Sequence, residues 1–127
     1  MIKNGYRYIK TIIDIEKFLS DTSNMYILVG QRPYKGKTDD KGNVLIDAGV
    51  TVTLQIIDDN SEPIVDKEGA TREDNRLETF EATIVGENYP LDLKKGDCVC
   101  LEDFRQDISY YINYAFVLRF GNIAKVG

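Results

Sequence analysis

The chain has 127 residues, of which 43% are hydrophobic and 29% are charged, and its formal net charge is −5. This length predicts a single domain, residues 1–127, with a hydrophobic core of its own. The composition is that of a globular protein, and no apolar run reaches the roughly 20 residues that a membrane-spanning helix needs. The first residues lack the apolar block of a secretory signal, so we expect a cytoplasmic protein with no membrane partner.

The first 24 residues predict an N-terminal arm followed by a short helix. Residues 1–10 are polar with a few spaced apolar positions, which indicates a loose arm or an edge strand. From Asp14 to Leu19, apolar residues recur at spacings of three and four, as in a helix. Asp14 can cap this helix, because a carboxylate accepts the free amide hydrogens of the first turn.

Five short segments that follow predict β-strands. The clearest is residues 49–57, where apolar residues alternate with threonine and glutamine. The five strands are predicted at residues 25–32, 49–57, 78–85, 97–101 and 114–120. The side chains expected in the core are Val50, Val52, Leu54 and Ile56 in the second strand, Phe80, Ala82 and Ile84 in the third, and Phe116, Leu118 and Phe120 in the fifth.

The order of these elements predicts an all-β fold with one short N-terminal helix. Five short antiparallel strands without a long helix between them are typical of a small five-stranded Greek-key barrel of the OB type. Residues 25–125 would form this OB-like β-barrel. Such barrels usually carry a helix between the third and fourth strands. Here residues 86–96 are too short and too interrupted by proline for one, and the predicted helix precedes the first strand instead.

The negative charge of the chain is confined to one predicted loop. Residues 58–78 hold eight acids and three bases, and eight minus three accounts for the whole excess of five. The loop is long for a compact domain, which is typical of a functional or a mobile segment. Its carboxylates could bind a basic protein or lie over a basic groove of the barrel, or they could form a solvated excursion. The residues that would contact a protein partner are Asp58, Asp59, Glu62, Asp66 and Glu68.

Several segments resemble a known family. They are Tyr34, Asp40-Lys41-Gly42-Asn43, Gly49-Val50-Thr51-Val52-Thr53-Leu54-Gln55, Phe80-Glu81-Ala82, Leu93-Lys94-Lys95-Gly96-Asp97-x-Val99 and Phe116-Val117-Leu118-Arg119-Phe120. Over about residues 25–125 the chain is similar to small proteins carried by Gram-positive integrative and conjugative elements. That family includes helicase processivity factors, which are OB-like proteins that bind single-stranded DNA and assist a helicase during element replication. The resemblance implies single-strand binding, with a helicase or relaxase as the protein partner.

Two predicted loops carry tyrosines interleaved with basic residues. In an OB barrel, the loops between strands one and two and between strands four and five flank the binding face. Aromatic faces stack on bases and cations meet phosphates, so this pattern indicates a site for single-stranded DNA. The alternative is that the tyrosines only cover the ends of the barrel. The expected DNA-binding residues are Arg32, Tyr34, Lys35, Lys37 and Lys41 on one side, and Arg105, Tyr110, Tyr111 and Arg119 on the other.

Catalysis and metal binding are not expected. The chain has no histidine and no glycine-rich phosphate-binding motif, and Cys98 and Cys100 have no third cysteine to complete a metal site. We therefore predict a non-catalytic accessory protein of a mobile genetic element, without a cofactor. It would bind single-stranded DNA and support helicase-driven replication or conjugative transfer. The alternative is an acidic interaction module that docks or inhibits a nucleic-acid enzyme without binding DNA itself.

Overall fold

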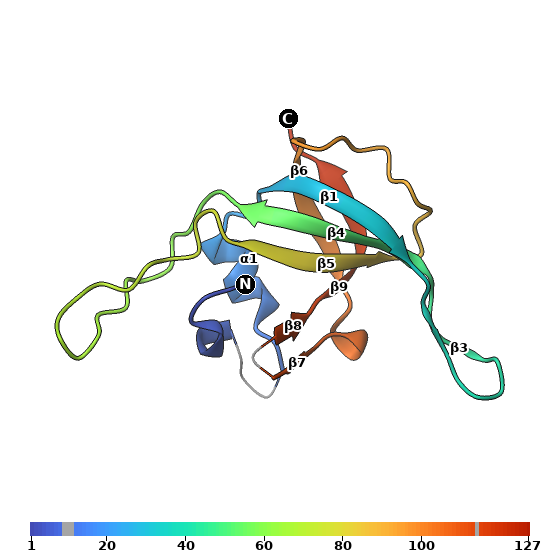
Figure 1. Ribbon diagram of the computed structural model, residues 1–127, viewed down its shortest axis with the longest axis horizontal. Coiled ribbons are helices and arrows are strands. Elements are labelled where there is room, and N and C mark those ends of the chain that lie inside the picture. The colour runs from blue at the N-terminus through green and yellow to red at the C-terminus, as the bar shows by residue number, and fades with distance from the viewer. Residues whose placement is uncertain (9–11, 114) are drawn as a thin grey trace.

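The computed structural model describes residues 1–8, 12–113 and 115–127, and its centre is a closed five-stranded barrel (Figure 1). The barrel strands follow the spatial order β1-β4-β5-β9-β6. All neighbouring strands are antiparallel except β5 and β9, which are parallel. The strands are β1 (Tyr26–Tyr34), β4 (Gly49–Ile56), β5 (Thr79–Val85), β6 (Cys98–Phe104) and β9 (Arg119–Lys125). The predicted fold class, a small all-β barrel of the OB-like kind, is confirmed.

Shorter elements decorate the barrel. They are η1 (Gly5–Tyr8), α1 (Ile15–Asp21), β2 (Lys37–Thr38), β3 (Val44–Ile46), η2 (Gln106–Ile108), β7 (Tyr110–Ile112) and β8 (Ala115–Val117). β2 pairs with β3 and β7 pairs with β8 as two small hairpins outside the barrel. Of these four short strands, only β8 falls within a predicted strand, the fifth. None of the helices in the described part of the chain is both long and apolar enough to cross a membrane.

The core follows the predicted alternation in β4 and β5. The apolar side chains of β4, from Val50 to Ile56, are fully buried, and so are Ala82 and Ile84 of β5. Thr51 is also buried, although the alternation places it on the outer face of β4. Its hydroxyl shares a 2.9 Å hydrogen bond with that of Thr83 on β5. The outer face of these two strands is therefore partly covered.

The predicted fifth strand is wrong in its bounds. The strand that closes the barrel is Arg119–Lys125, and residues 115–117 belong to the β7–β8 hairpin; residue 114 lies outside the described residues. Leu118 and Phe120 are buried as predicted, whereas Phe116 is only half-buried. The apolar alternation continues through Leu118 without interruption. Sequence alone could not divide it into a hairpin strand and a barrel strand.

Helix α1 closes one end of the barrel through an aromatic cluster. Asp14 caps it as predicted, because its side chain accepts a hydrogen bond from the amide of Lys17 at 3.3 Å. Phe18 is 2% exposed and packs edge-on against Tyr8 and Phe80, with ring centroids 5.2 and 5.3 Å apart. Residues 86–97 between β5 and β6 hold no helix. This barrel therefore has no helix between its third and fourth strands, and the helix that packs against its core is α1, which precedes β1.

The N-terminal segment is not a loose arm. Ile2 and Tyr8 are buried, and Tyr8 donates a hydrogen bond to Asp21 at 3.1 Å. The prediction of a loose arm or an edge strand is therefore wrong for residues 1–8, which include η1 and contribute Ile2 and Tyr8 to the core. Residues 9 and 10 lie outside the described residues. The error arises because the spaced apolar side chains are too few to show a helical or a strand period.

Two arms project from opposite ends of the barrel (Figure 1). One is the β2–β3 hairpin with its flanking residues, 35–48. The other is the acidic loop, 58–78, which folds back on itself through a bridge between Val65 and Thr71. The amide of Arg72 donates to the carbonyl of Ile64 at 2.7 Å, and the amide of Asp66 to that of Ala70 at 2.9 Å. The acidic loop is therefore a hairpin-like projection held by its own backbone hydrogen bonds.

Candidate nucleic-acid interface

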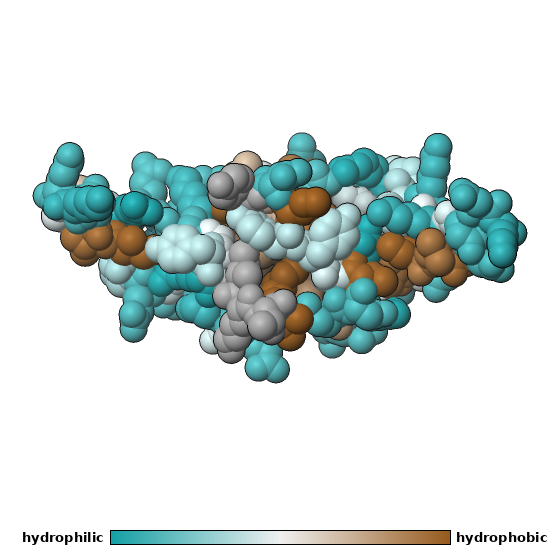
Figure 2. Space-filling view, turned by 90° about the horizontal axis from the view of Figure 1, so that it is seen from below, coloured by the Kyte–Doolittle hydropathy of each residue, from teal (hydrophilic) through white to brown (hydrophobic). Residues whose placement is uncertain are grey.

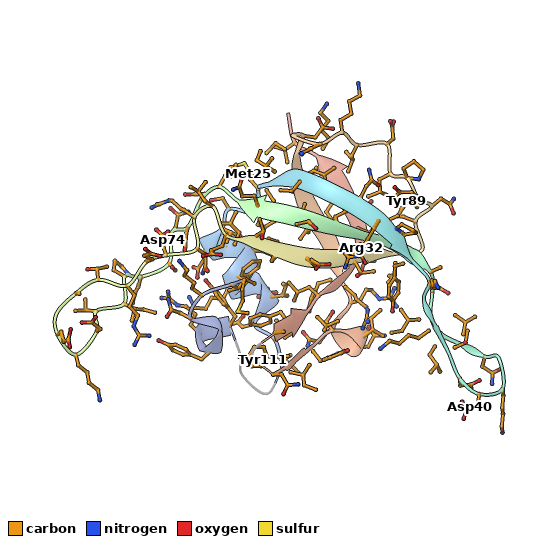
Figure 3. The ribbon with its side chains drawn as sticks, viewed as in Figure 1. Met25, Arg32, Asp40, Asp74, Tyr89 and Tyr111 are labelled. Carbon is orange, nitrogen blue, oxygen red and sulfur yellow. The ribbon has the colours of Figure 1, made fainter. Side chains whose placement is uncertain are left out.

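A groove runs across the outer face of β4 and β5, and β8 forms its opposite wall. It consists of two adjoining cavities of about 320 and 300 Å³. Both cavities are lined by Glu81, Phe116 and Leu118, so they form one continuous depression, which we call the barrel groove. Figure 3 shows Arg32 on the face of the barrel and Tyr111 on the β7–β8 hairpin below it. OB barrels bind oligonucleotides on the face formed by their second and third strands, between the first-to-second and fourth-to-fifth strand loops. The barrel groove lies on this face.

The barrel groove has a polar floor and aromatic side chains along it. Arg32 and Glu81 form an ion pair on the floor, and their side chains are 58% and 53% exposed. The hydroxyls of Thr51 and Thr83 lie beside this pair. Tyr34 and Phe116 supply the aromatic surface. Such a combination can stack bases and also form hydrogen bonds with them.

Arg119 connects the two loops that were predicted to flank the face. Its guanidinium carbon lies 5.6 Å from the ring centroid of Tyr34 and 5.8 Å from that of Tyr110. It donates hydrogen bonds to the Tyr34 hydroxyl, at 3.3 Å, and to the Ile108 carbonyl. Among the residues that the structure describes, its Nε finds no hydrogen-bond partner. The two loops therefore meet at one buried cation.

The predicted role of Arg119 in contacting DNA needs correction. The side chain is only 4% exposed, so a phosphate cannot reach it in this arrangement. The alternation of buried Leu118 and Phe120 places Arg119 between them on the outer face of the barrel, and the structure agrees. The β7–β8 hairpin and Tyr34 then cover it. Arg119 positions the tyrosines at the edge of the groove.

Tyr111 belongs to a second aromatic contact on the same side of the molecule. Its ring lies 4.8 Å from that of Phe116, centroid to centroid, and the side chain is half-buried. It also lines a cavity of about 570 Å³ together with the N-terminal residues Met1 to Tyr6. Tyr110, at 41% exposure, is the more accessible of the two tyrosines. The aromatic residues of β7 and β8 thus extend from the groove toward the N-terminus.

The predicted lysines do not line the barrel groove. Lys35, Lys37 and Lys41 are exposed on the β2–β3 arm, which projects away from the barrel. Figure 3 shows Asp40 at the tip of that arm. Arg105 follows β6 and lies 3.7 Å from Asp107, without lining either cavity of the groove. These four cations can meet only a strand that extends beyond the groove.

Figure 2 views the molecule from the side of the β7–β8 hairpin and shows hydrophobic surface at the centre and on both arms, within a hydrophilic surround. The exposed apolar residues include Ile112 on β7, Val44 and Leu45 on one arm, and Val65 on the other. Exposed apolar side chains on this face therefore occur both at the centre and on the two arms.

Sequence reasoning missed Glu81, Thr83 and Phe116 as groove residues. The alternation in β5 already buries Phe80, Ala82 and Ile84, so Glu81 and Thr83 had to face outward on a strand of the binding face. The alternation in β5 therefore contains the signal that places Glu81 and Thr83 on the outer face. Phe116 could not be found in this way, because its expected place was in the core.

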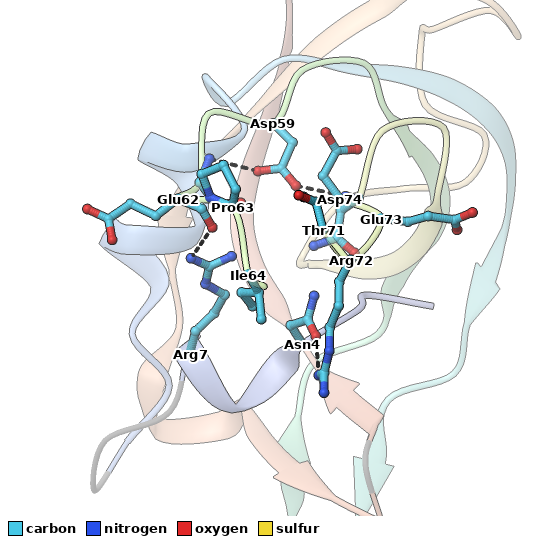
Figure 4. Close-up of a pocket in the computed structure, with 12 residues that line it drawn as sticks. Asn4, Arg7, Asp59, Glu62, Pro63, Ile64, Thr71, Arg72, Glu73 and Asp74 are labelled. Atoms are coloured by element: carbon cyan, nitrogen blue, oxygen red, sulfur yellow. Dashed lines mark hydrogen bonds between the residues drawn. The ribbon is translucent and has the colours of Figure 1, made fainter. Parts of the chain in front are cut away.

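Several carboxylates of the acidic loop accept hydrogen bonds from within the protein. Some of them line a small pocket beside η1 (Figure 4). Asp59 is 4% exposed and accepts hydrogen bonds from the amides of Ser61 and Asn75, at 2.9 and 2.7 Å. A role for Asp59 in contacting a partner is therefore corrected to a structural one. Two further predicted carboxylates also accept hydrogen bonds from within the protein. They are Asp58, which accepts from Ser23 and Asn60, and Asp66, which accepts from the amides of Glu68 and Ala70.

The base of the loop also holds the N-terminal segment. The ammonium of Lys3 lies 2.5 Å from Glu73 and 2.9 Å from Glu78, and the terminal amine lies 3.3 Å from Glu78. Arg7 donates to the carbonyl of Glu62 at 2.9 Å. The side chains of Glu62 and Glu68, both predicted to contact a partner, are exposed. Only part of the predicted acidic patch is thus presented to solvent.

We expect Asp59→Asn to lower the free energy of unfolding by about 1–3 kcal/mol near neutral pH, because one buried amide loses its acceptor. Burial works against the charged carboxylate, but the hydrogen bonds from Ser61 and Asn75 outweigh it and hold the pKa of Asp59 below its usual value. A lowered pKa stabilises the fold above the unfolded value of about 4, and this contribution is lost as the pH falls through the folded value. The difference between the wild type and the variant should therefore shrink on acidification below pH about 4.

Urea titrations from neutral to acidic pH measure this difference. Asp40→Asn, the same change at the exposed tip of the other arm, is the control and should leave stability unchanged. A gap between wild type and Asp59→Asn that stays constant down to the lowest pH would contradict the assignment.

No metal centre emerges among the described residues, where no group of three or more Cys, Asp or Glu side chains is arranged to hold an ion.

Comparison of the chain with protein-family models, with curated proteins and with solved structures finds no match.

Proposed function

We propose that the protein is a non-catalytic accessory protein that binds single-stranded DNA in the barrel groove. One observation carries this proposal. Tyr34 at the end of β1 and Tyr110 at the start of β7, far apart in the sequence, meet around Arg119 beside a groove with a polar floor. Single-strand binders of the OB type use this face and these loops, with aromatic rings that stack on successive bases.

The resemblance to proteins of integrative and conjugative elements supports a role in element replication or transfer. In this role the protein would hold the displaced single strand while a helicase advances, with the helicase or a relaxase as the protein partner. The net charge of −5 is compatible with such binding, because the excess lies in the 58–78 arm rather than in the groove. The competing role as an acidic docking module has less support, since Asp59 and Asp66 close turns of their own loop and Asp58 accepts a hydrogen bond from Ser23, just after α1.

We expect labelled single-stranded DNA of about 30 nucleotides to bind more tightly than its duplex, with an affinity that falls steeply as salt rises. Tyr34→Ala should weaken binding about 5- to 150-fold, the range that one lost stacking contact of ~1–3 kcal/mol gives. Fluorescence anisotropy at low and moderate salt measures both effects. Tyr34→Phe keeps the ring and loses only the hydroxyl that accepts from Arg119, so it should bind like the wild type.

An absence of single-strand binding at low salt, where electrostatic attraction is strongest, would rule out the proposal. Equal losses for Tyr34→Phe and Tyr34→Ala, with unchanged thermal unfolding, would instead show that the hydroxyl matters rather than the stacking surface.

A further inference from the structure

We propose that Arg32 and Glu81 read the edges of bases, and that guanine is preferred over thymine at this point of the barrel groove. This inference rests on the proposed function. In this arrangement the strand lies with its bases against β4 and β5 and with its phosphates toward solvent. Arg32 and Glu81 would thus be specificity-determining residues within an otherwise sequence-tolerant interface.

The charge of the groove floor determines which side of the strand can face it. Arg32 is offset by its ion pair with Glu81, and the neighbouring Thr51 and Thr83 are neutral. A phosphate on this floor would meet a carboxylate at short range, which is unfavourable. Bases carry no such charge, and their edges offer N–H donors to a carboxylate. The floor is therefore suited to bases, and the exposed lysines of the β2–β3 arm, such as Lys35, are left for phosphates.

The aromatic rings beside the floor would set the orientation of a base. Tyr34 and Phe116 line the same cavity as Arg32 and Glu81. A base that stacks on one of these rings presents its edge, not its face, to the polar floor. This arrangement of stacking surface and edge-reading groups is how proteins select among unpaired bases.

The donor and acceptor pattern of the ion pair matches guanine. A carboxylate accepts at two oxygens and a guanidinium only donates. The Watson–Crick edge of guanine offers one acceptor, O6, next to two donors, N1–H and N2–H. Glu81 can take both donors while Arg32 donates to O6. Thymine offers a single donor between two acceptors, so it leaves one carboxylate oxygen without a partner.

The ion pair can open to admit a base. More than half of each side chain is exposed, and ion pairs of this kind add little to stability. The exchange of the Arg32–Glu81 contact for contacts with guanine therefore has a small cost. A buried pair would resist this exchange.

The experiment compares three strands of about twelve nucleotides, a length within the usual site size. One is all thymine, one carries a few isolated guanines, and one carries inosine at the same positions, which removes only the N2 amino group. We expect the wild type to bind the guanine strand at least about fivefold more tightly than the other two. In Glu81→Gln the ratio of guanine to inosine affinity should fall below about twofold, with binding to thymine retained.

Glu102→Gln is the matched control. It removes the same charge on β6, which pairs with neither β4 nor β5, and the new amide can still accept from Asn122. Its guanine preference should equal that of the wild type.

Two results would overturn the inference and leave the proposed function standing. One is equal binding of all three strands by the wild type. The other is a Glu81→Gln variant that binds all three more tightly by the same factor, which would make Glu81 a repelling charge only. Failure of every strand to bind at low salt would overturn both the inference and the proposed function.

Discussion

Phe18→Ala is expected to lower the free energy of unfolding by about 3–5 kcal/mol, the usual cost of truncating a buried phenylalanine. Phe18 is 2% exposed and contacts the rings of Tyr8, Tyr26 and Phe80. Its removal would leave a cavity between α1 and the end of the barrel. Because these neighbours belong to η1 and to two strands, they cannot all move in to fill the space.

Urea unfolding followed by circular dichroism measures this loss. Ile12→Ala removes apolar atoms just before the same helix, but Ile12 is 56% exposed, so its cost should stay within about 0.5 kcal/mol. A loss below about 1 kcal/mol for Phe18→Ala would show that α1 does not close the barrel. The expected result makes α1 an integral part of the domain, as its packing against Tyr8, Tyr26 and Phe80 indicates.

Gly49→Ala is expected to cost at least about 3 kcal/mol, at the upper end of the range for overpacking. Gly49 begins β4 and is the partner of Val85 on β5. A β-carbon at this position would lie 2.0 Å from the carbonyl oxygen of Ile84. The clash is with backbone rather than with a flexible side chain, so relief requires that β4 and β5 separate. The variant should unfold at lower urea concentration or fail to accumulate as folded protein.

Gly30→Ala is the matched control for this strand glycine. A β-carbon on Gly30 meets nothing within 4 Å, and its backbone lies outside the left-handed region. The substitution should be neutral or stabilise the fold by about 0.4–1 kcal/mol, because alanine reduces the freedom of the unfolded chain. Equal stability of the two variants would contradict the close approach of β4 to β5. The contact matters for the proposed function because these two strands form the floor of the barrel groove.

The arrangement of charge makes the proposed nucleic-acid interface compatible with an acidic protein. Coulomb repulsion between exposed groups fades beyond a Debye length, about 8–10 Å at physiological salt. The acidic arm projects from one end of the barrel (Figure 1), whereas the groove lies along the outer face of β4 and β5. Several carboxylates of the arm are also engaged with Lys3 and with amides of the loop. The excess of five negative charges therefore belongs to the acidic arm and not to the groove.

Local patterns were sufficient to predict much of the barrel. The alternation in residues 49–57 identified the buried face of β4, since side chains of a strand point to opposite sides in turn. The spacing of apolar residues after Asp14 located α1 and its cap. The shortness of 86–96 excluded a helix there. Each of these features depends on residues close together in the chain, so the sequence carries the information directly.

The candidate site depended on contacts that no local pattern encodes. Arg119 and Tyr34 are 85 positions apart, and their contact buries a cation that the alternation could only place on the outer face. The same folding of the β7–β8 hairpin over the sheet took Phe116 out of the core and into the groove. Likewise, the hydrogen bond from the amide of Asn75 to the buried Asp59 carboxylate makes part of the predicted acidic patch a structural part of the loop. The sequence by itself determined the approximate positions of β1, β4, β5 and β6 and which side chains of β4 and β5 face the core. Only the tertiary structure decided which outward faces stay open to a ligand, because this depends on where distant segments pack.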